Sequence, residues 1–178
     1  MEIFVLTILI LINGFFALSE VALISSKPAR LEQFKINGKK GARTALKLLE
    51  NSENFLSAIQ VGITLIGIVT GVYGGMNLAD DFTPFFTQFE LTQLYAHQIA
   101  LTLTVLVITF ISIVIGELVP KTIALGNPEQ IAMSVAPAIS IFSKVFYPFV
   151  KLLALSRLRQ AAASLVPLLP SFPLTLST

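Results

Sequence analysis

The chain has 178 residues, of which 54% are hydrophobic and 12% are charged, and its mean hydropathy of +0.83 is far above that of a soluble domain. It contains no cysteine and a single histidine, which excludes disulfides, thiolate metal sites and imidazole-rich zinc sites. The composition therefore predicts an integral membrane protein, in which any bound metal must be held by oxygen ligands.

Three stretches are apolar and long enough to cross about 30 Å of hydrocarbon at about 1.5 Å per residue. They are residues 3–26, 54–75 and 98–121. The first lacks a basic leading region and is too long for the apolar core of a cleaved signal peptide, so we expect it to be retained as an anchor. The predicted fold is an all-α membrane protein with three transmembrane helices.

The segment between the first two spans is strongly basic, whereas residues 76–98 contain no lysine or arginine and three acids. The segment between the first two spans holds seven of the twelve basic residues of the chain: Lys27, Arg30, Lys35, Lys39, Lys40, Arg43 and Lys47. The positive-inside rule then predicts an external N terminus and a cytoplasmic C terminus at the plasma (inner) membrane. Two short amphipathic helices, 29–36 and 41–49, are expected there, with contact to anionic lipid as the simplest role of the charges.

A further apolar helix is predicted over residues 128–157. Asn127-Pro128-Glu129 is a typical helix start, and Pro137 and Pro148 should bend the helix. Because a fourth crossing would place Arg157 and Arg159 outside, we expect a kinked juxtamembrane belt helix at the cytoplasmic interface. Residues 160–178, with three prolines and no regular period, are expected to form a poorly ordered tail.

Two acids interrupt apolar stretches. Glu20 lies in the first span, and Glu117 follows the uncharged run from Ile99 to Ile115. A carboxylate at such a depth costs from about 2.5 to well above 10 kcal/mol, so it is usually paired, functional or both. Since Pro120 cannot donate to the carbonyl of Gly116, that oxygen is expected to be free beside Glu117 as a metal ligand.

The alternative for Glu117 is a purely structural ion pair with Lys121, which lies four residues further on.

Polar and small residues also follow the other two spans. Ser19, Ser25 and Ser26 surround Glu20, and Gln60, Thr64, Gly67 and Gly71 form a stripe along the second span. These residues could be metal ligands. Hydroxyls can instead bond to their own helical turn and glycines can serve helix packing alone, so the structural and the ligand roles both stay open. As ligands, these oxygens suit Mg²⁺, Ca²⁺ or Na⁺, and spacing does not choose among the three ions.

The sequence shows no serine or cysteine nucleophile with a base, no phosphate-binding loop and no nucleic-acid-binding face. We therefore expect neither an enzyme nor a nucleic-acid partner.

Three motifs occur in a fixed order along the chain: NGFFALSEVALISS at residues 13–26, QVGITLIG at residues 60–67, and GELVPK at residues 116–121. Together they resemble the transmembrane domain of the CorC and cyclin M (CNNM) magnesium transporters, over residues 1–159.

The resemblance implies a homodimer in the lipid bilayer, each subunit having three spans, a cytoplasmic helical pair and a belt helix. It implies export of Mg²⁺ through an inward-facing ion site, driven by Na⁺ as the coupling ion. The metal-binding positions that it implies are Ser19, Glu20, Ser25, Gly62, Thr64, Gly116 and Glu117.

The sequence also contains no paired cystathionine-β-synthase-type or CorC-type cytoplasmic regulatory domain, which a full-length family member would have. We expect either a natural short form or an isolated transmembrane piece.

Two other functions stay open. One is a membrane-anchored Mg²⁺ sensor or regulator that binds the ion without moving it. The other is a proton-linked carrier that uses Glu20 and Glu117.

Overall fold

A computed structural model describes residues 1–88 and 93–165 of the chain. Within these residues every regular element is a helix and no strand occurs. The elements are α1 (Glu2–Ser25), α2 (Pro28–Ile36), α3 (Ala42–Glu50), α4 (Ser52–Phe86), η1 (Gln93–Tyr95), α5 (Ala96–Ile113), η2 (Val114–Leu118), α6 (Val119–Gly126) and α7 (Pro128–Leu165). Among them, α2 and α3 correspond to the short helices predicted over 29–36 and 41–49.

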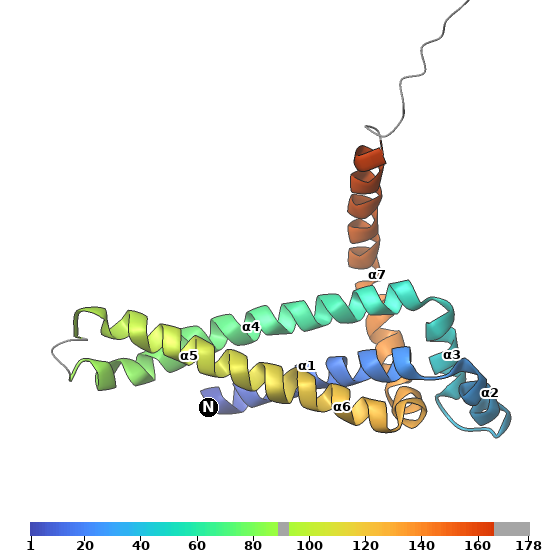
Figure 1. Cartoon of the computed structure of the whole chain (residues 1–178), viewed down its shortest axis with the longest axis horizontal. Coiled ribbons are helices and arrows are strands. Elements are labelled where there is room, and N and C mark those ends of the chain that lie inside the picture. Colours follow the sequence, from blue (N-terminus) through green and yellow to red (C-terminus); the bar gives the residue numbers. More distant parts are fainter. Residues whose placement is uncertain (89–92, 166–178) are drawn as a thin grey trace, which may run out of the picture.

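The long helices form a bundle. Figure 1 shows α1, α4 and the continuous α5–η2–α6 rod lying side by side, with α2 and α3 at one end and α7 running across that end. In the described residues, four segments are long and apolar enough to cross a membrane: Glu2–Ser25, Ser52–Phe86, Gln93–Gly126 and Pro128–Phe149. The prediction of an all-α, multi-pass membrane protein is confirmed.

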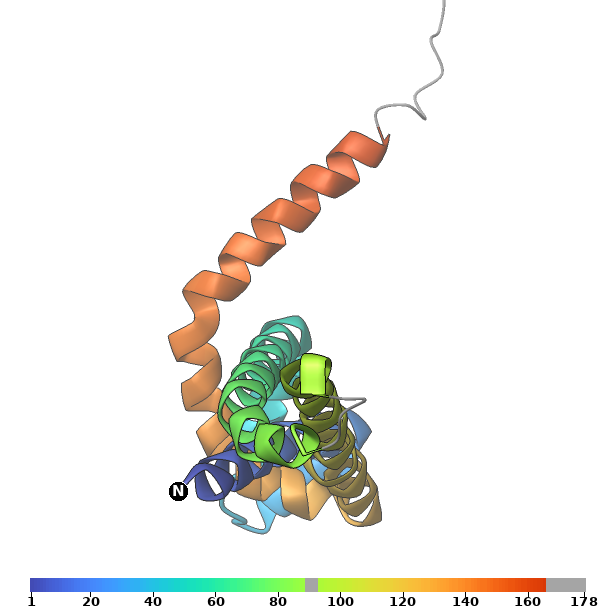
Figure 2. The ribbon, with the colours of Figure 1, turned by 90° about the vertical axis from the view of Figure 1, so that its left-hand side faces the viewer.

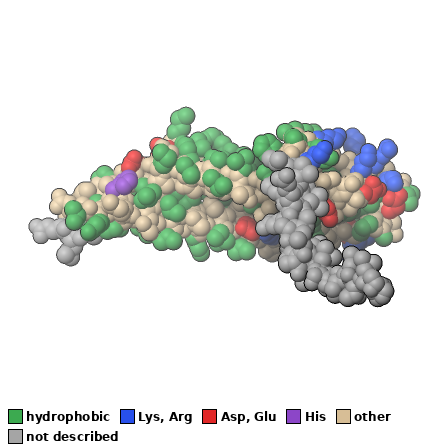
Figure 3. Space-filling view, turned by 90° about the horizontal axis from the view of Figure 1, so that it is seen from above, with side chains coloured by type: hydrophobic (Ala, Val, Ile, Leu, Met, Phe, Trp, Pro, Cys, Tyr) green, Lys and Arg blue, Asp and Glu red, His purple; other side chains and the backbone are tan. Residues whose placement is uncertain are grey.

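The buried core lies where α1, α2, α4 and α7 meet. Its largest fully buried side chains include Leu23, Leu31, Phe55, Ile59 and Ile139. This core fixes the start of α4 against α7. Figure 3 shows lysine and arginine side chains gathered at this end of the molecule, and the histidine near the opposite end.

Helix α4 is longer than predicted. The sequence placed the end of the second span at residue 75, whereas α4 continues to Phe86. Its extension packs against α5, with Ala79 fully buried. Pro84 is tolerated because it lies in the last turn, where little helix remains to be broken. Residues 89–92 lie outside the described part of the chain.

Helix α7 is also longer than predicted. It continues through Pro137 and Pro148 to Leu165, so residues 160–165 of the predicted tail are helical. Ala161 to Ala163 are strong helix formers, which accounts for the extension. Figure 2 shows α7 leaving the bundle and changing direction along its length. The rest of the predicted tail, residues 166–178, lies outside the described residues.

Candidate metal centre

Glu117 lies in a break in the regular helix. Residues Val114–Leu118 form the π-helical turn η2, in which the Val119 N–H bonds to the Val114 carbonyl five residues back. Pro120 follows directly, in the first turn of α6, and has no N–H to donate, so one backbone hydrogen bond of a regular α-helix is missing at this point. Single π turns of this kind occur frequently at functional sites.

Helix α1 approaches η2 closely at Gly116. A Cβ atom at Gly116 would lie 3.3 Å from Asn13 Nδ2 and 3.3 Å from the Ile10 carbonyl oxygen, so a larger residue would push the helices apart. The Asn13 side-chain amide donates a hydrogen bond to the Gly116 carbonyl oxygen at 3.2 Å. The prediction that this oxygen is free was therefore wrong: Pro120 does not satisfy it, but a second helix does.

The Glu117 carboxylate is paired with a lysine. Lys121 Nζ lies 2.6 Å from Glu117 Oε1 and 4.0 Å from Glu20 Oε2, and all three side chains are partly buried. The ion pair with Lys121, which the sequence offered as the alternative for Glu117, is present in the structure. The structure adds Glu20 to it, so one ammonium group stands between carboxylates from two helices.

Glu117 also lines a cavity of about 220 Å³ between α1, α4 and α5. Asn13, Thr70, Thr109 and Ser112 supply polar groups to the same wall. Two of these residues carry a buried oxygen, Asn13 Oδ1 and Ser112 Oγ, that has no hydrogen-bond partner among the described residues. Because an unsatisfied buried acceptor costs about 1–3 kcal/mol, such atoms point to a ligand or a water in the cavity.

The oxygen set around the cavity suits a hard cation. It combines one carboxylate, one amide oxygen and hydroxyl groups, which are ligands of Mg²⁺, Ca²⁺ or Na⁺. In the described part of the chain, no three His, Asp or Glu side chains cluster closely enough to hold a metal by themselves. A cation here would therefore depend on neutral oxygens and on exchange with Lys121.

The remaining residues named by the sequence lie elsewhere. Ser19 is fully buried and its hydroxyl donates to the Phe15 carbonyl oxygen at 2.7 Å, which is the bond to its own turn that was weighed above. Gly62 is buried against the rings of Phe16 and Phe142. Ser25 is half-buried and Thr64 is exposed. None of these four lines the cavity beside Glu117, whereas Glu20, Gly116 and Glu117 come together.

Three residues at the centre were not among the predicted ligands: Asn13, Ser112 and Lys121. Asn13 could have been found because it shares a helical face with Glu20. Ser112 and Glu117 are five residues apart, which a regular helix places well apart in angle, but a π turn takes more residues per turn and brings them closer to one side.

Comparison with known proteins gives one family. A family model described as "Cyclin M transmembrane N-terminal domain" matches residues 4–162. The "UPF0053 protein sll0260" of Synechocystis sp. is 45% identical over 156 residues, which are 88% of this chain and 35% of that protein. In Bacillus subtilis, "UPF0053 protein YrkA" is 32% identical and "UPF0053 protein YhdP" is 34% identical, each over 82% of this chain. The chain spans about a third of the length of these relatives, namely 35%, 34% and 33%.

Proposed function

The chain belongs to the cyclin M (CNNM) transmembrane domain family, and from this premise we propose that it forms the membrane part of a Mg²⁺ transporter. Under this proposal it exports Mg²⁺ from the cytoplasm across the plasma membrane, with inward movement of Na⁺ as the driving force. Both ions are cargo of the protein.

One observation carries the proposal. Glu117 lines the same cavity as Asn13 and Ser112, and each of these two residues carries a buried side-chain oxygen without a hydrogen-bond partner among the described residues. These two oxygens come from different helices inside an apolar bundle, and a cation bound beside Glu117, directly or through water, would satisfy them. A purely structural Glu117–Lys121 pair would explain the survival of the acid, but it leaves the two neutral oxygens unexplained.

Lys121 supplies the gate in this mechanism. Its ammonium group is the counter-charge that Glu117 and Glu20 share when no cation is bound, since it lies 2.6 Å and 4.0 Å from their oxygens. An arriving Mg²⁺ displaces the ammonium group from Glu117 and enters the cavity, where Asn13 and Ser112 replace part of its water shell. When the ion leaves, Lys121 returns, so neither carboxylate is left without a counter-charge in the membrane.

The topology we propose has three crossings per subunit, formed by α1, α4 and α5–η2–α6. The N terminus is outside, and α7 serves as a belt at the cytoplasmic face. The crosswise course of α7 over the end of the bundle supports this arrangement (Figure 1), and so do the basic residues collected at the same end (Figure 3).

We propose further that two copies pair in the membrane. Gln60, Thr64 and Gly67 are exposed on one side of α4. Amide and hydroxyl groups facing lipid are costly, while small and polar residues at helix interfaces are favourable, so a second subunit would cover this stripe. The site would then lie close to the subunit boundary.

A sensor that binds Mg²⁺ without moving it is the second candidate function. The ion pair of Lys121 is compatible with such a sensor, because replacing the ammonium group by a metal ion would change the local structure whether or not the ion crosses the membrane. Both a transporter and a sensor would bind Mg²⁺, but only a transporter would move it across the membrane.

The test uses Glu117→Gln, which keeps the shape of the side chain and removes its charge. In liposomes loaded with Mg²⁺, the purified chain should release the ion when an Na⁺ gradient is imposed, and the variant should lose this flux. Glu50→Gln, which removes an exposed acid outside the cavity, is the matched control and should keep it. Binding of Mg²⁺ without flux in the unchanged chain would establish the sensor instead, and flux driven by a pH gradient would establish the proton-linked carrier.

A further inference from the structure

Phe142 joins α7 to two helices of the bundle through one aromatic contact. A Cβ atom at Gly62 of α4 would lie 3.0 Å from Phe142 Cζ and 3.3 Å from Cζ of Phe16 on α1, so the two rings fill the space that the glycine leaves free. The centroids of the Phe16 and Phe142 rings lie 4.6 Å apart, at an interplanar angle of 54°. Such a pair is attractive beyond the apolar area that it buries, so it fixes α7 against α1 and α4.

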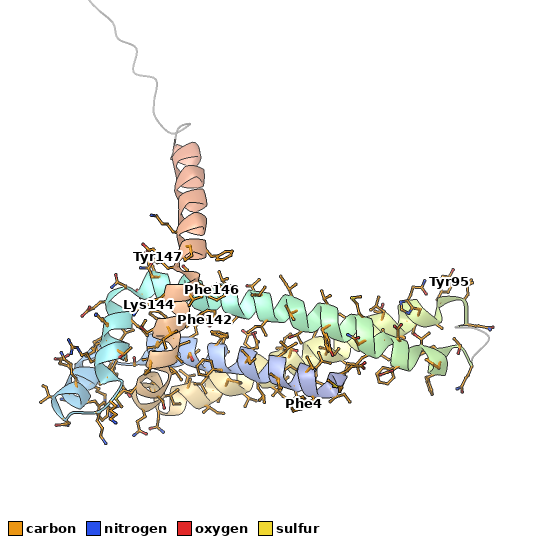
Figure 4. The ribbon with its side chains drawn as sticks, turned by 180° about the vertical axis from the view of Figure 1, so that it is seen from behind. Phe4, Tyr95, Phe142, Lys144, Phe146 and Tyr147 are labelled. Carbon is orange, nitrogen blue, oxygen red and sulfur yellow. The ribbon has the colours of Figure 1, made fainter. Side chains whose placement is uncertain are left out.

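The contact lies where α7 changes its surroundings. Before it, Val135 and Ile139 are buried in the core, whereas after it Val145 and Phe149 are 64% and 60% exposed. Figure 2 shows α7 leaving the bundle, and Figure 4 shows Phe142 where α7 passes α4. A displacement of the projecting part of α7 would therefore reach the bundle at Phe142.

Phe16 shares one side of α1 with two polar residues of the candidate site. At 100° per residue it lies about 60° from Asn13 and about 40° from Glu20 around the helix axis. Asn13 donates a hydrogen bond to η2 at 3.2 Å, and Glu20 lies 4.0 Å from Lys121 Nζ. Because the Phe16 ring is only 6% exposed and is held against Phe142, it limits rotation of α1 about its axis. The directions in which Asn13 and Glu20 point therefore depend on this contact.

The aromatic contact also borders the Glu117 cavity. Asn13 on α1 and Ile63 on α4 line the cavity. Phe16 follows Asn13 by about one helical turn, and Gly62 directly precedes Ile63. A shift of the Phe16 ring would thus move the α1 wall of the cavity without any element in between.

We propose that Phe142 is a positioning residue for the cation site: through Phe16 it sets the rotation of α1, and so the placement of Asn13 in the cavity beside Glu117. This inference rests on the proposed Mg²⁺ site and adds α7 as the element whose position sets the affinity of that site. Phe142 does not line the cavity, so it acts on the ion through α1 alone.

The first test is a double-mutant cycle on Mg²⁺ affinity, measured by calorimetric titration of the purified chain in detergent. Phe142→Leu removes the ring and keeps an apolar side chain, so Mg²⁺ should bind about fivefold more weakly. In the Asn13→Ala background the same substitution should change the affinity by less than about 1.5-fold, because the ligand that Phe142 positions is gone. Equal weakening in both backgrounds would overturn the proposal, since a general loss of packing affects both alike.

Phe149→Leu is the matched control for the cycle. It makes the same change on the same helix, at a ring that is 60% exposed, and should leave the Mg²⁺ affinity unchanged in both backgrounds. Weakening as large as that of Phe142→Leu would show that any aromatic residue of α7 has this effect, and would contradict a specific role for Phe142.

The second test does not depend on Mg²⁺. Because the chain contains no cysteine, spin labels can be attached at Phe4→Cys on α1 and Ile123→Cys on α6, whose native side chains are 68% and 56% exposed. Pulsed electron paramagnetic resonance should show that Phe142→Leu shifts or broadens the distance distribution between the labels, and that Phe149→Leu does not. An unchanged distribution in Phe142→Leu would overturn the inference and leave the Mg²⁺ site standing. If the unchanged chain does not bind Mg²⁺, the proposed function fails, and the label distances still decide whether Phe142 holds α1.

Gly62→Ala tests the same contact from the opposite wall, and it replaces Phe142→Leu if that variant does not fold by circular dichroism. The added methyl group would meet both rings at 3.0 Å and 3.3 Å, so Phe142 and Phe16 must move. Mg²⁺ binding should weaken and the label distances should change. Unchanged values of both would contradict the proposal.

Discussion

The Glu117 cavity differs in the kind of group that lines it from a hollow of about 510 Å³ at the basic end of the bundle, between α3, the start of α4 and α7. The cavity is lined by one carboxylate and by amide and hydroxyl groups, and by no lysine or arginine; Lys121 pairs with Glu117 from outside the lining. The hollow is lined by two lysines and several donors, and by no acid. The same bundle thus has one concave surface that carries a carboxylate and another that carries two lysines.

The difference also concerns how each region is held together. Around Glu117 the charges are few and each carboxylate has a partner, so binding must exchange one cation for another. At the basic end helix packing fixes the shape, and Lys47 and Lys144 form no ion pair with the described residues. Four substitutions can break or sharpen this contrast.

The largest effect is expected at Gly41, where α3 meets α7. Gly41 has φ +85°, and a Cβ atom there would meet the backbone carbonyl of Met133. Gly41→Ala therefore combines a left-handed backbone, at about 1–2 kcal/mol, with overpacking at about 1–3 kcal/mol, and should destabilise the fold by about 3 kcal/mol. Thermal unfolding followed by circular dichroism would measure it.

Gly38→Ala is the matched control for this position. Gly38 has φ +70° but nothing within 4 Å of the added Cβ atom, so it should show only the backbone cost of about 1–2 kcal/mol. Equal losses in the two variants would mean that the contact with Met133 does not hold α3 against α7.

Lys121→Met tests the shared ammonium group at the other site. The variant keeps the aliphatic part of the side chain but leaves Glu117 and Glu20 without their common partner. Because Mg²⁺ would no longer compete with an internal cation, it should bind about tenfold more tightly, while the metal-free protein loses about 1–2 kcal/mol of stability. Calorimetric titration and thermal unfolding with and without Mg²⁺ measure the two effects.

The control for Lys121 is Lys35→Met, which breaks the exposed pair between Lys35 and Glu32. This variant should have the same Mg²⁺ affinity and the same stability as the unchanged protein, within experimental error. Weaker Mg²⁺ binding in Lys121→Met would show that the lysine helps to hold the ion. It would contradict the proposed displacement of the Lys121 ammonium group by Mg²⁺.

The sequence was informative wherever a single helix decides the outcome. Apolar runs located the bundle helices, and the charges at Glu20 and Glu117 drew attention to the centre because acids in apolar runs are costly. The extension of α4 to Phe86 was missed, since Asp80, Asp81 and Pro84 are typical of a loop. That extension depends on packing against α5, which local patterns do not report.

The geometry of the candidate site could be predicted only in part, for the same reason. The spacing of Glu117 and Lys121 predicted their ion pair, but nothing in the sequence indicated that Lys121 also approaches Glu20. The contact of Asn13 with Gly116 requires α1 to lie against a π turn. Gly62, which the sequence named as a metal-binding position, instead lies against the rings of Phe16 and Phe142, where it allows close helix packing.

Glu129 provides a smaller test, of the ion pairing at the start of α7. Its carboxylate is nearly buried, lies 3.3 Å from Arg30 Nη1 and accepts the Lys27 backbone N–H at 3.4 Å. Glu129→Gln should lower the free energy of unfolding by about 1 kcal/mol, since a hydrogen-bonded charge is lost while the guanidinium remains largely exposed. Urea unfolding of the detergent-solubilised chain would measure the change. Glu32→Gln, at an exposed pair, should cost less than about 0.5 kcal/mol, and a loss as large as that of Glu129→Gln would show that burial is irrelevant here.

The smallest change in stability, and the sharpest test of the cavity, is expected from Ser112→Ala. Because Ser112 Oγ is buried and has no partner, its removal should leave the free energy of unfolding unchanged or raise it by up to about 1 kcal/mol. The same substitution removes an oxygen from the wall that faces Glu117, so Mg²⁺ should bind several-fold more weakly in a calorimetric titration. Ser19→Ala is the comparison: that hydroxyl already donates to the Phe15 carbonyl and lies outside the cavity, so Mg²⁺ binding should not change. If Ser19→Ala weakens Mg²⁺ binding and Ser112→Ala does not, the ion is held nearer the C-terminal end of α1, beside Ser19 and Glu20. The cavity beside Asn13 is then not its site.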